Sequence, residues 1–154
     1  MEKFHEYFLK AKRDLATADH LAYVTFSLIK DKKLLLKILE QIKSALTNFI
    51  NSVLHLEYIY KRISLYSDPE ENLRTFIEKC APRYSITKKE IKKIQEILEL
   101  YKKHVKSPME FVKNEKVIIM SENSSVESLD IEKIKGFISI VKTIIEKAQP
   151  KILR

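Results

Sequence analysis

The chain opens with a helical pattern of apolar and polar positions. Core-type positions recur at alternating steps of four and three residues, which is the spacing of one face of an α-helix. They are Phe4, Phe8, Ala11, Leu15, Ala18, Ala22, Thr25 and Ile29. This spacing predicts a first helix over residues 4–29.

A second seam follows after Asp31, which can break the first helix and cap the next one. Its positions are Leu35, Leu39, Ile42, Leu46, Phe49, Val53, Leu56, Tyr60 and Ile63. Because no glycine or proline interrupts the seam, it predicts a second helix over 32–65. Such a helix would be about 50 Å long at about 1.5 Å per residue, longer than a small domain is wide. We therefore expect it to project, to kink or to pair with a second subunit.

A start signal for a short third helix lies at Asp68-Pro69, followed by two glutamates. Asp68 can cap the helix, Pro69 suits its first position, and the acidic residues face the positive end of the helix dipole. We expect this helix to end at Ala81, because Pro82 disfavours helical geometry in the residue before it.

Thr87 and Glu90 form the capping-box pattern at the start of a fourth helix, which we expect to end near Lys106. Ser107 and Glu110 repeat that pattern with a proline between them, which predicts a short turn of helix over 108–114. The following segment is rich in β-branched residues and interrupted by turn residues, so 116–129 can form a small β-hairpin or an extended flap.

A last helix is expected from Asp130, which can cap it, to Pro150, which can end it. The inward-facing positions are Ile134, Phe137, Ile138, Val141, Ile144, Ile145 and Ala148. Four long amphipathic segments with short connections predict an all-α fold. We expect an antiparallel bundle of four main helices plus short helices, in a single domain over residues 1–154.

Composition supports this fold class and narrows the chemistry. One glycine and four prolines in 154 residues are too few for a sandwich, a barrel or a glycine-rich phosphate loop. The single cysteine, Cys80, rules out an internal disulfide and favours a cytoplasmic protein with a buried structural thiol. We expect no signal peptide, no membrane span, no metal site and no cofactor. The bias toward lysine, glutamate and isoleucine fits a hot-living source or an AT-rich genome.

Positive charge is uneven along the chain, whose net charge is +8. Residues 81–116 hold ten Lys or Arg against five Glu. The candidate nucleic-acid-binding residues in this stretch are Lys102, Lys103, Lys106, Lys113 and Lys116. The alternative to a binding site is that these lysines form an ordinary solvated helix face, interleaved with glutamates. Tyrosines beside positive charge, at Tyr60-Lys61-Arg62 and at Tyr101, could stack a base if they are exposed.

His104 and Glu110 are the only candidate catalytic residues. His104 ends the fourth helix, where the dipole favours the protonated ring, and the following cap could bring Glu110 back toward it. A His and a Glu beside lysines could perform acid–base chemistry on a phosphodiester. The alternative is a histidine that merely stabilises the helix terminus.

The layout resembles that of the HEPN superfamily of small helical domains. Two long helices, 4–29 and 32–65, precede a basic helix that ends in Tyr101-Lys-Lys-His104-Val-Lys-Ser-Pro-Met-Glu-Phe111, and a last helix follows. The resemblance implies a homodimer that binds RNA or a nucleotidyltransferase-type protein, as an RNA-binding or toxin/antitoxin-associated module.

Catalytic members of that family are metal-independent ribonucleases with an arginine, four to six residues, and then a histidine. No arginine precedes His104 at that spacing, and Arg13 and His20, which have the spacing, lie in the first helix. We therefore expect no ribonuclease activity. The alternative function is a protein-interaction or scaffold module that docks a partner through the second helix or the 116–129 flap. An RNA-binding protein should gather the five lysines on one concave face, whereas an interaction module should expose an apolar patch.

Overall fold

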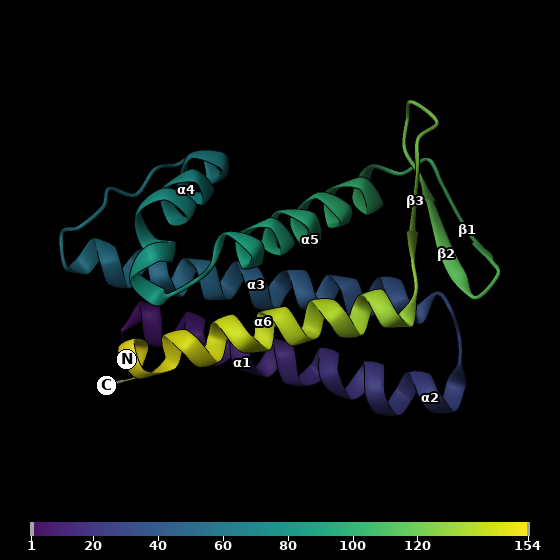
Figure 1. Cartoon of the computed structure of the whole chain (residues 1–154), viewed down its shortest axis with the longest axis horizontal. Coiled ribbons are helices and arrows are strands. Elements are labelled where there is room, and N and C mark those ends of the chain that lie inside the picture. Colours follow the sequence, from purple (N-terminus) through teal and green to yellow (C-terminus); the bar gives the residue numbers. More distant parts are fainter. Residues whose placement is uncertain (1, 154) are drawn as a thin grey trace.

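The computed structural model describes residues 2–153, and it is mostly helical with one small antiparallel sheet (Figure 1). The longer elements are α1 (Lys3–His20), α2 (Phe26–Ile29), α3 (Leu34–Ile59), α4 (Pro69–Thr75), α5 (Lys88–Lys106), β1 (Met109–Lys113), β2 (Lys116–Met120), β3 (Val126–Leu129) and α6 (Ile131–Ile152). The sheet lies at one end of the molecule, and the ends of the chain lie at the other. The predicted helical fold with a hairpin is confirmed at this level.

The first predicted helix is confirmed as one continuous helical segment. A π-helical turn over Leu21–Thr25 joins α1 to α2 without a break. The segment ends at Lys30, whose φ of 57° is left-handed.

The second helix is shorter than predicted, because α3 ends at Ile59 and not near 65. Lys61 adopts a left-handed φ of 60°, and the Arg62 N–H donates back to the Glu57 carbonyl at 3.0 Å. Together with the bond from Lys61 N–H to the Tyr58 carbonyl, this is a Schellman turn without glycine. The helix is therefore about 39 Å long, and it lies in the middle of the molecule with most of its faces covered. The prediction that this helix continues to residue 65 was wrong, and its pairing with a second subunit stays a prediction.

The third helix begins as predicted, with the Asp68 side chain accepting from Glu70 N–H at 3.0 Å. It does not stop at Ala81. A π-helical turn over Phe76–Cys80 leads into a 3₁₀ turn over Ala81–Tyr84. Pro82 is tolerated there because it stands in the first turn, where its missing N–H would have no partner.

The boundaries of α5 are confirmed. Thr87 Oγ1 accepts from Glu90 N–H at 3.1 Å, and the Glu90 carboxylate accepts from Thr87 N–H at 2.9 Å. The capping box is thus complete, and the helix ends at Lys106.

The sequence predicted a short turn of helix over 108–114, and this prediction was wrong. The segment instead contains strand β1. The Ser107 hydroxyl does not cap a helix, because it donates to the carbonyls of Met109 and Met120 and so fastens β1 to β2. Asn114 and Glu115 both have positive φ, which forms the two-residue type I′ turn of a β-hairpin. The hairpin predicted at 116–129 is confirmed as β2 and β3, and the sheet order is β1-β2-β3.

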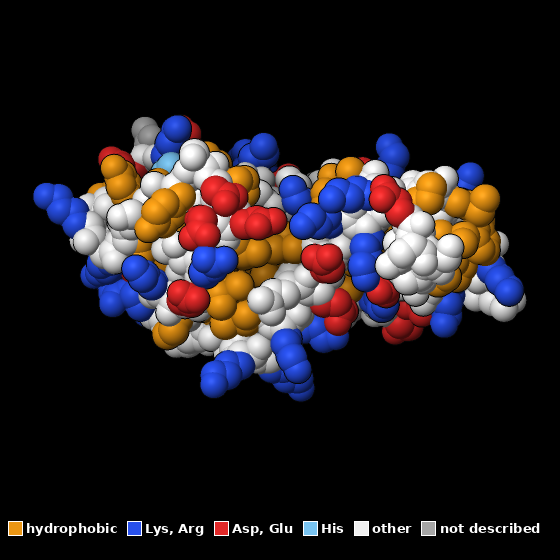
Figure 2. Space-filling view, turned by 90° about the horizontal axis from the view of Figure 1, so that it is seen from above, with side chains coloured by type: hydrophobic (Ala, Val, Ile, Leu, Met, Phe, Trp, Pro, Cys, Tyr) orange, Lys and Arg blue, Asp and Glu red, His pale blue; other side chains and the backbone are white. Residues whose placement is uncertain are grey.

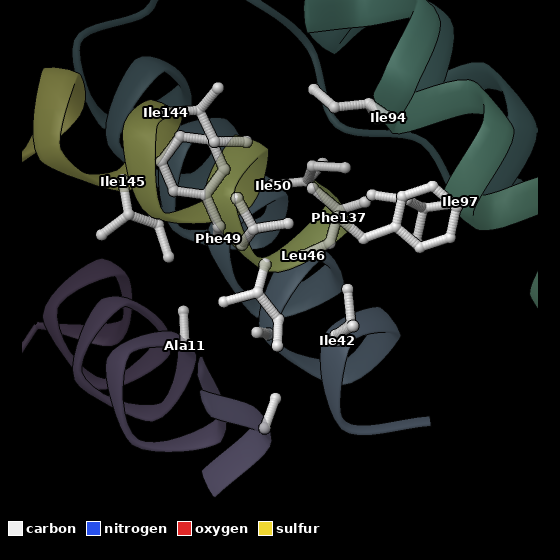
Figure 3. Packing of buried hydrophobic residues seen from close by; sticks show 14 of the residues in the cluster. Ala11, Ile42, Leu46, Phe49, Ile50, Ile94, Ile97, Phe137, Ile144 and Ile145 are labelled. Carbon is white, nitrogen blue, oxygen red and sulfur yellow. The ribbon is translucent and has the colours of Figure 1, made fainter. Parts of the chain in front are cut away.

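The last helix begins at the predicted cap, where Asp130 accepts from Lys133 N–H at 2.8 Å. Pro150 does not end α6, which continues to Ile152. Side chains of α1, α3, α5 and α6 converge in one buried cluster (Figure 3). Small residues of α1, such as Ala11 and Ala18, are fully buried and let α1 approach α3 closely. Within residues 2–153, no helix has both the length and the apolar character needed to cross a bilayer.

Candidate functional site

His104 lies in the last turn of α5 between two carboxylates. Its Nδ1 is 2.7 Å from Oε2 of Glu110 on β1, and its Nε2 is 3.4 Å from Oε1 of Glu40 on α3. The His104 side chain is only 14% exposed. The sequence analysis placed Glu110 near His104 correctly, although it comes from a strand. It missed Glu40, which lies 64 residues away and has no distinguishing local pattern.

This arrangement limits what His104 can do chemically. Both ring nitrogens already face carboxylates, and only the imidazolium form can donate to both at once. Nδ1 makes the short contact, to Glu110, whereas Nε2 makes only a long contact with the half-exposed Glu40. The two carboxylates also lie on opposite sides of the ring, so they do not converge on one point. Accordingly, no cluster of three or more His, Cys, Asp or Glu in residues 2–153 is arranged to hold a metal ion.

Three of the five candidate lysines line a shallow cleft of about 450 Å³ beside the C-terminal half of α5. The cleft is lined by Glu99, Lys102, Lys103, Lys106, Ser121, Glu122, Asn123 and Ser125. Lys103 Nζ lies 2.9 Å from Oε1 of Glu127, and this hydrogen bond raises the pKa of Lys103. Carboxylates therefore share the cleft with the lysines. Figure 2 shows positive and negative side chains interspersed on this side of the molecule.

The other two candidate lysines are elsewhere. Lys113 and Lys116 are paired across the β1–β2 ladder and flank the turn at Asn114–Glu115, at the end of the hairpin away from the cleft. Glu115 in that turn forms an ion pair with Lys32 at 2.6 Å. The five lysines therefore do not share one face, which is the arrangement expected of an RNA-binding protein, because the length of β2 separates Lys113 and Lys116 from the cleft.

Of the two tyrosines considered for base stacking, only Tyr60 has a ring that is mostly exposed to solvent. Tyr101 is partly buried, with its ring in a T-shaped arrangement with His104 and the Lys43 ammonium 4.9 Å from its centroid. Tyr60 is 60% exposed, and the Arg62 guanidinium lies 4.8 Å from its ring centroid.

The sheet has one buried and one exposed face. Val117, Ile119 and Leu129 are almost fully buried against the helices. The opposite face carries residues that the strand register places side by side: Met109, Phe111, Ile118, Met120 and Val126. Met109 and Val126 are 57% and 55% exposed. Figure 2 shows hydrophobic side chains gathered at the end of the molecule that carries the sheet.

Strand β1 is also an edge strand, since β2 is its only ladder partner among residues 2–153. In a two-residue hairpin the residues flanking the turn, Lys113 and Lys116, form a hydrogen-bonded pair, and bonding then alternates along the ladder. Phe111 therefore bonds to β2, whereas the backbone groups of Glu110 and Val112 point to the open edge. An apolar, open edge is a surface that soluble proteins normally protect.

Comparison with known proteins found no matching family model, curated protein or solved structure.

Proposed function

We propose that this protein is a non-enzymatic interaction module that docks a partner strand on the open edge of β1. The observation that carries the proposal is the exposed apolar face of the sheet, formed around Met109, Phe111 and Val126. Apolar side chains on an unprotected edge strand favour strand addition, in which backbone hydrogen bonds give affinity and side chains give specificity. In this proposal α1, α3, α5 and α6 act as an antiparallel four-helix bundle that supports the sheet.

The partner we propose is β1 of a second copy of the chain. Antiparallel pairing about a two-fold axis at Phe111 would set Glu110 opposite Val112 of the other copy, and Met109 opposite its Lys113. Like charges directly opposite each other would disfavour pairing, and this register places none opposite each other. The backbone groups of Glu110 and Val112 are the ones that point outward, so this register would also satisfy them. The product would be a six-stranded sheet with one continuous apolar face.

Sedimentation equilibrium and a cysteine crosslink test this proposal. Wild-type protein should be dimeric at about 100 μM, and Val112→Pro should weaken the dimer by at least about tenfold because it removes an outward N–H. Val112→Ala keeps that N–H and is the matched control. In the Phe111→Cys variant, oxidation should join the two copies, because directly opposed residues of a non-hydrogen-bonded pair are close enough for a disulfide.

Two outcomes would contradict the proposal. One is a wild-type protein that remains monomeric at the highest concentration. The other is equal crosslinking of Phe111→Cys and Val126→Cys, since Val126 is exposed on the same face but lies on β3, away from the proposed axis.

A second candidate function is RNA binding, favoured by the three lysines that line the cleft. It agrees with what the HEPN resemblance implies, including an RNA or nucleotidyltransferase-type partner without ribonuclease activity. Binding of labelled single-stranded RNA at about 50 mM and about 200 mM salt tests it. This function is supported if RNA binding is salt-sensitive and is weakened by Lys102→Gln and Lys106→Gln. If the protein instead cleaves RNA, and His104→Ala abolishes that cleavage, the protein is a ribonuclease. Unchanged binding in Lys102→Gln and Lys106→Gln excludes the cleft as its site.

A further inference from the structure

A buried carboxylate holds two arginines at the end of the molecule opposite the sheet. Glu57, in the last turn of α3, is 1% exposed. Its Oε2 accepts from Arg62 Nη1 at 2.9 Å, and its Oε1 lies 2.7 Å from Arg83 Nε. The Tyr84 hydroxyl donates to Oε2 at 3.3 Å. Arg62 comes from the turn after α3, and Arg83 from the 3₁₀ turn before α5, so three segments meet at one carboxylate.

The Arg83 contact differs from the Arg62 contact. Although the Arg83 Nε is close to Oε1 of Glu57, its N–H is not directed at that oxygen, which accepts no hydrogen bond. The contact is therefore an ion pair. It fixes the position of the guanidinium while leaving its hydrogen-bond donors free.

The cluster has more positive charge and more donors than Glu57 can use. One carboxylate faces two guanidinium groups, and within residues 2–153 neither arginine forms an ion pair with another acid. Each guanidinium offers five N–H donors, and the Arg62 and Arg83 side chains are 43% and 47% exposed. Both guanidinium-bearing side chains are therefore accessible to a ligand from solvent.

The spacing of the two arginines suits a phosphate. Their contacting nitrogens are both within 2.9 Å of one carboxylate, so these two atoms are at most about 8 Å apart, which permits a single phosphate to reach donors of both groups. Guanidinium groups recognise phosphate oxygens through paired, planar donors, which a lysine cannot reproduce.

An aromatic surface adjoins this donor pair. Tyr60 is exposed, and Arg62 stacks against its ring. Tyr58 and Tyr66 are also about half exposed nearby in the sequence. An exposed aromatic ring beside an arginine is a stacking platform for a nucleobase whose phosphate the arginine binds.

We propose that Arg62 and Arg83, positioned by Glu57, bind the phosphate of a nucleotide, with Tyr60 stacking against its base. The nucleotide is either free or the 5′ end of an RNA chain, since both present the same phosphate and base. This site is independent of the sheet edge and of the lysine cleft, which lie at the opposite end of the molecule and beside α5.

Calorimetric titration with adenosine monophosphate, adenosine, and short RNAs with and without a 5′ phosphate tests the site. Removing an arginine would leave the buried Glu57 carboxylate under-compensated. The test variants are therefore Arg62→Lys and Arg83→Lys, which keep the positive charge but lose the paired, planar N–H donors of the guanidinium. Each should weaken binding of the phosphorylated probes by about tenfold, and Tyr60→Ala should weaken it several-fold. Arg74→Lys, in an exposed pair with Glu71, is the control and should bind as wild type does.

The probes separate the two sources of the phosphate. Binding of adenosine monophosphate but not of 5′-phosphorylated RNA identifies a free nucleotide as the ligand, and the reverse identifies an RNA end. Equal affinity for adenosine and its monophosphate, or unchanged binding in both arginine variants, would overturn the proposal. So would the absence of binding to every phosphorylated probe at millimolar concentration.

Discussion

His104 Nδ1 lies 2.7 Å from Oε2 of Glu110, and this contact joins the end of α5 to the edge strand β1. The preceding residue, Lys103, makes the corresponding contact with Glu127 on β3 at 2.9 Å. Glu110 and Glu127 flank the fully buried Ile119 of β2 in the strand register. Two consecutive residues of α5 therefore contact both outer strands. In this arrangement His104 helps to hold the sheet against α5.

We expect His104→Ala to destabilise the fold by about 1–2 kcal/mol, because it leaves the partly buried Glu110 carboxylate without its hydrogen-bond partner. Urea unfolding followed by circular dichroism measures the change in the free energy of unfolding. Glu40→Ala is the control and should cost less than about 0.5 kcal/mol, since Glu40 is half exposed and its contact is long. A His104→Ala variant as stable as wild type would show that the ring does not fasten the sheet.

Stability should fall in acid through Glu90. Burial alone would raise the pKa of Glu90, but hydrogen bonds from Lys147 and the Thr87 N–H outweigh it and lower that pKa. A carboxyl with a lowered pKa in the folded state contributes stability above its unfolded value of about 4.5, and this is lost as the pH falls through the folded value. Glu90→Gln should therefore flatten the acid limb of a plot of unfolding free energy against pH.

The matched control for that experiment is Glu96→Gln. Like Glu90, Glu96 pairs with a lysine, but this lysine is Lys93 of the same helix, and both side chains are 43% exposed. The exposed pair should leave the acid limb as in wild type. If Glu90→Gln and Glu96→Gln give the same pH profile, the buried contact with Lys147 is not the source of the acid sensitivity.

Cys80 should be inert in the folded protein. Burial, and secondarily the nearby Glu57 charge, raise the pKa of its thiol to about 12. Since the thiolate is the reactive form, a thiol reagent at pH 8 should modify Cys80 only at the rate of unfolding and promptly in denaturant. A cysteine introduced at the exposed Val126 gives the reference rate. Prompt modification of Cys80 under native conditions would place the thiol at the surface.

Local bonds explain which parts of the fold could be predicted. The caps at Asp68, Thr87 and Asp130 join groups within three residues of each other, so short sequence patterns contain both partners. The helices that begin at these caps were predicted at their observed starts. The same holds for the pairing of His104 with Glu110, which are six residues apart.

Contacts between distant segments explain what the sequence did not predict. Ser107 resembled a helix cap, but one of its partners is the Met120 carbonyl across the hairpin. Glu40 meets His104 from 64 residues away, and Glu57 meets Arg83 only after the chain has folded back. Strand pairing likewise places Lys113 and Lys116 away from the cleft, a separation that no local pattern in the sequence indicates.

The end of α3 is the clearest case of a boundary without a sequence signal, and it yields a direct test. Lys61 holds a left-handed φ of 60°, which costs a residue with a β-carbon about 1 kcal/mol relative to glycine. Lys61→Gly should therefore raise the free energy of unfolding in urea by about 0.5–1 kcal/mol. Lys12→Gly, at an exposed position inside α1, should instead lower it by about 1 kcal/mol. Loss of stability in both variants would mean that the chain does not turn left-handed at Lys61, and that α3 continues toward residue 65.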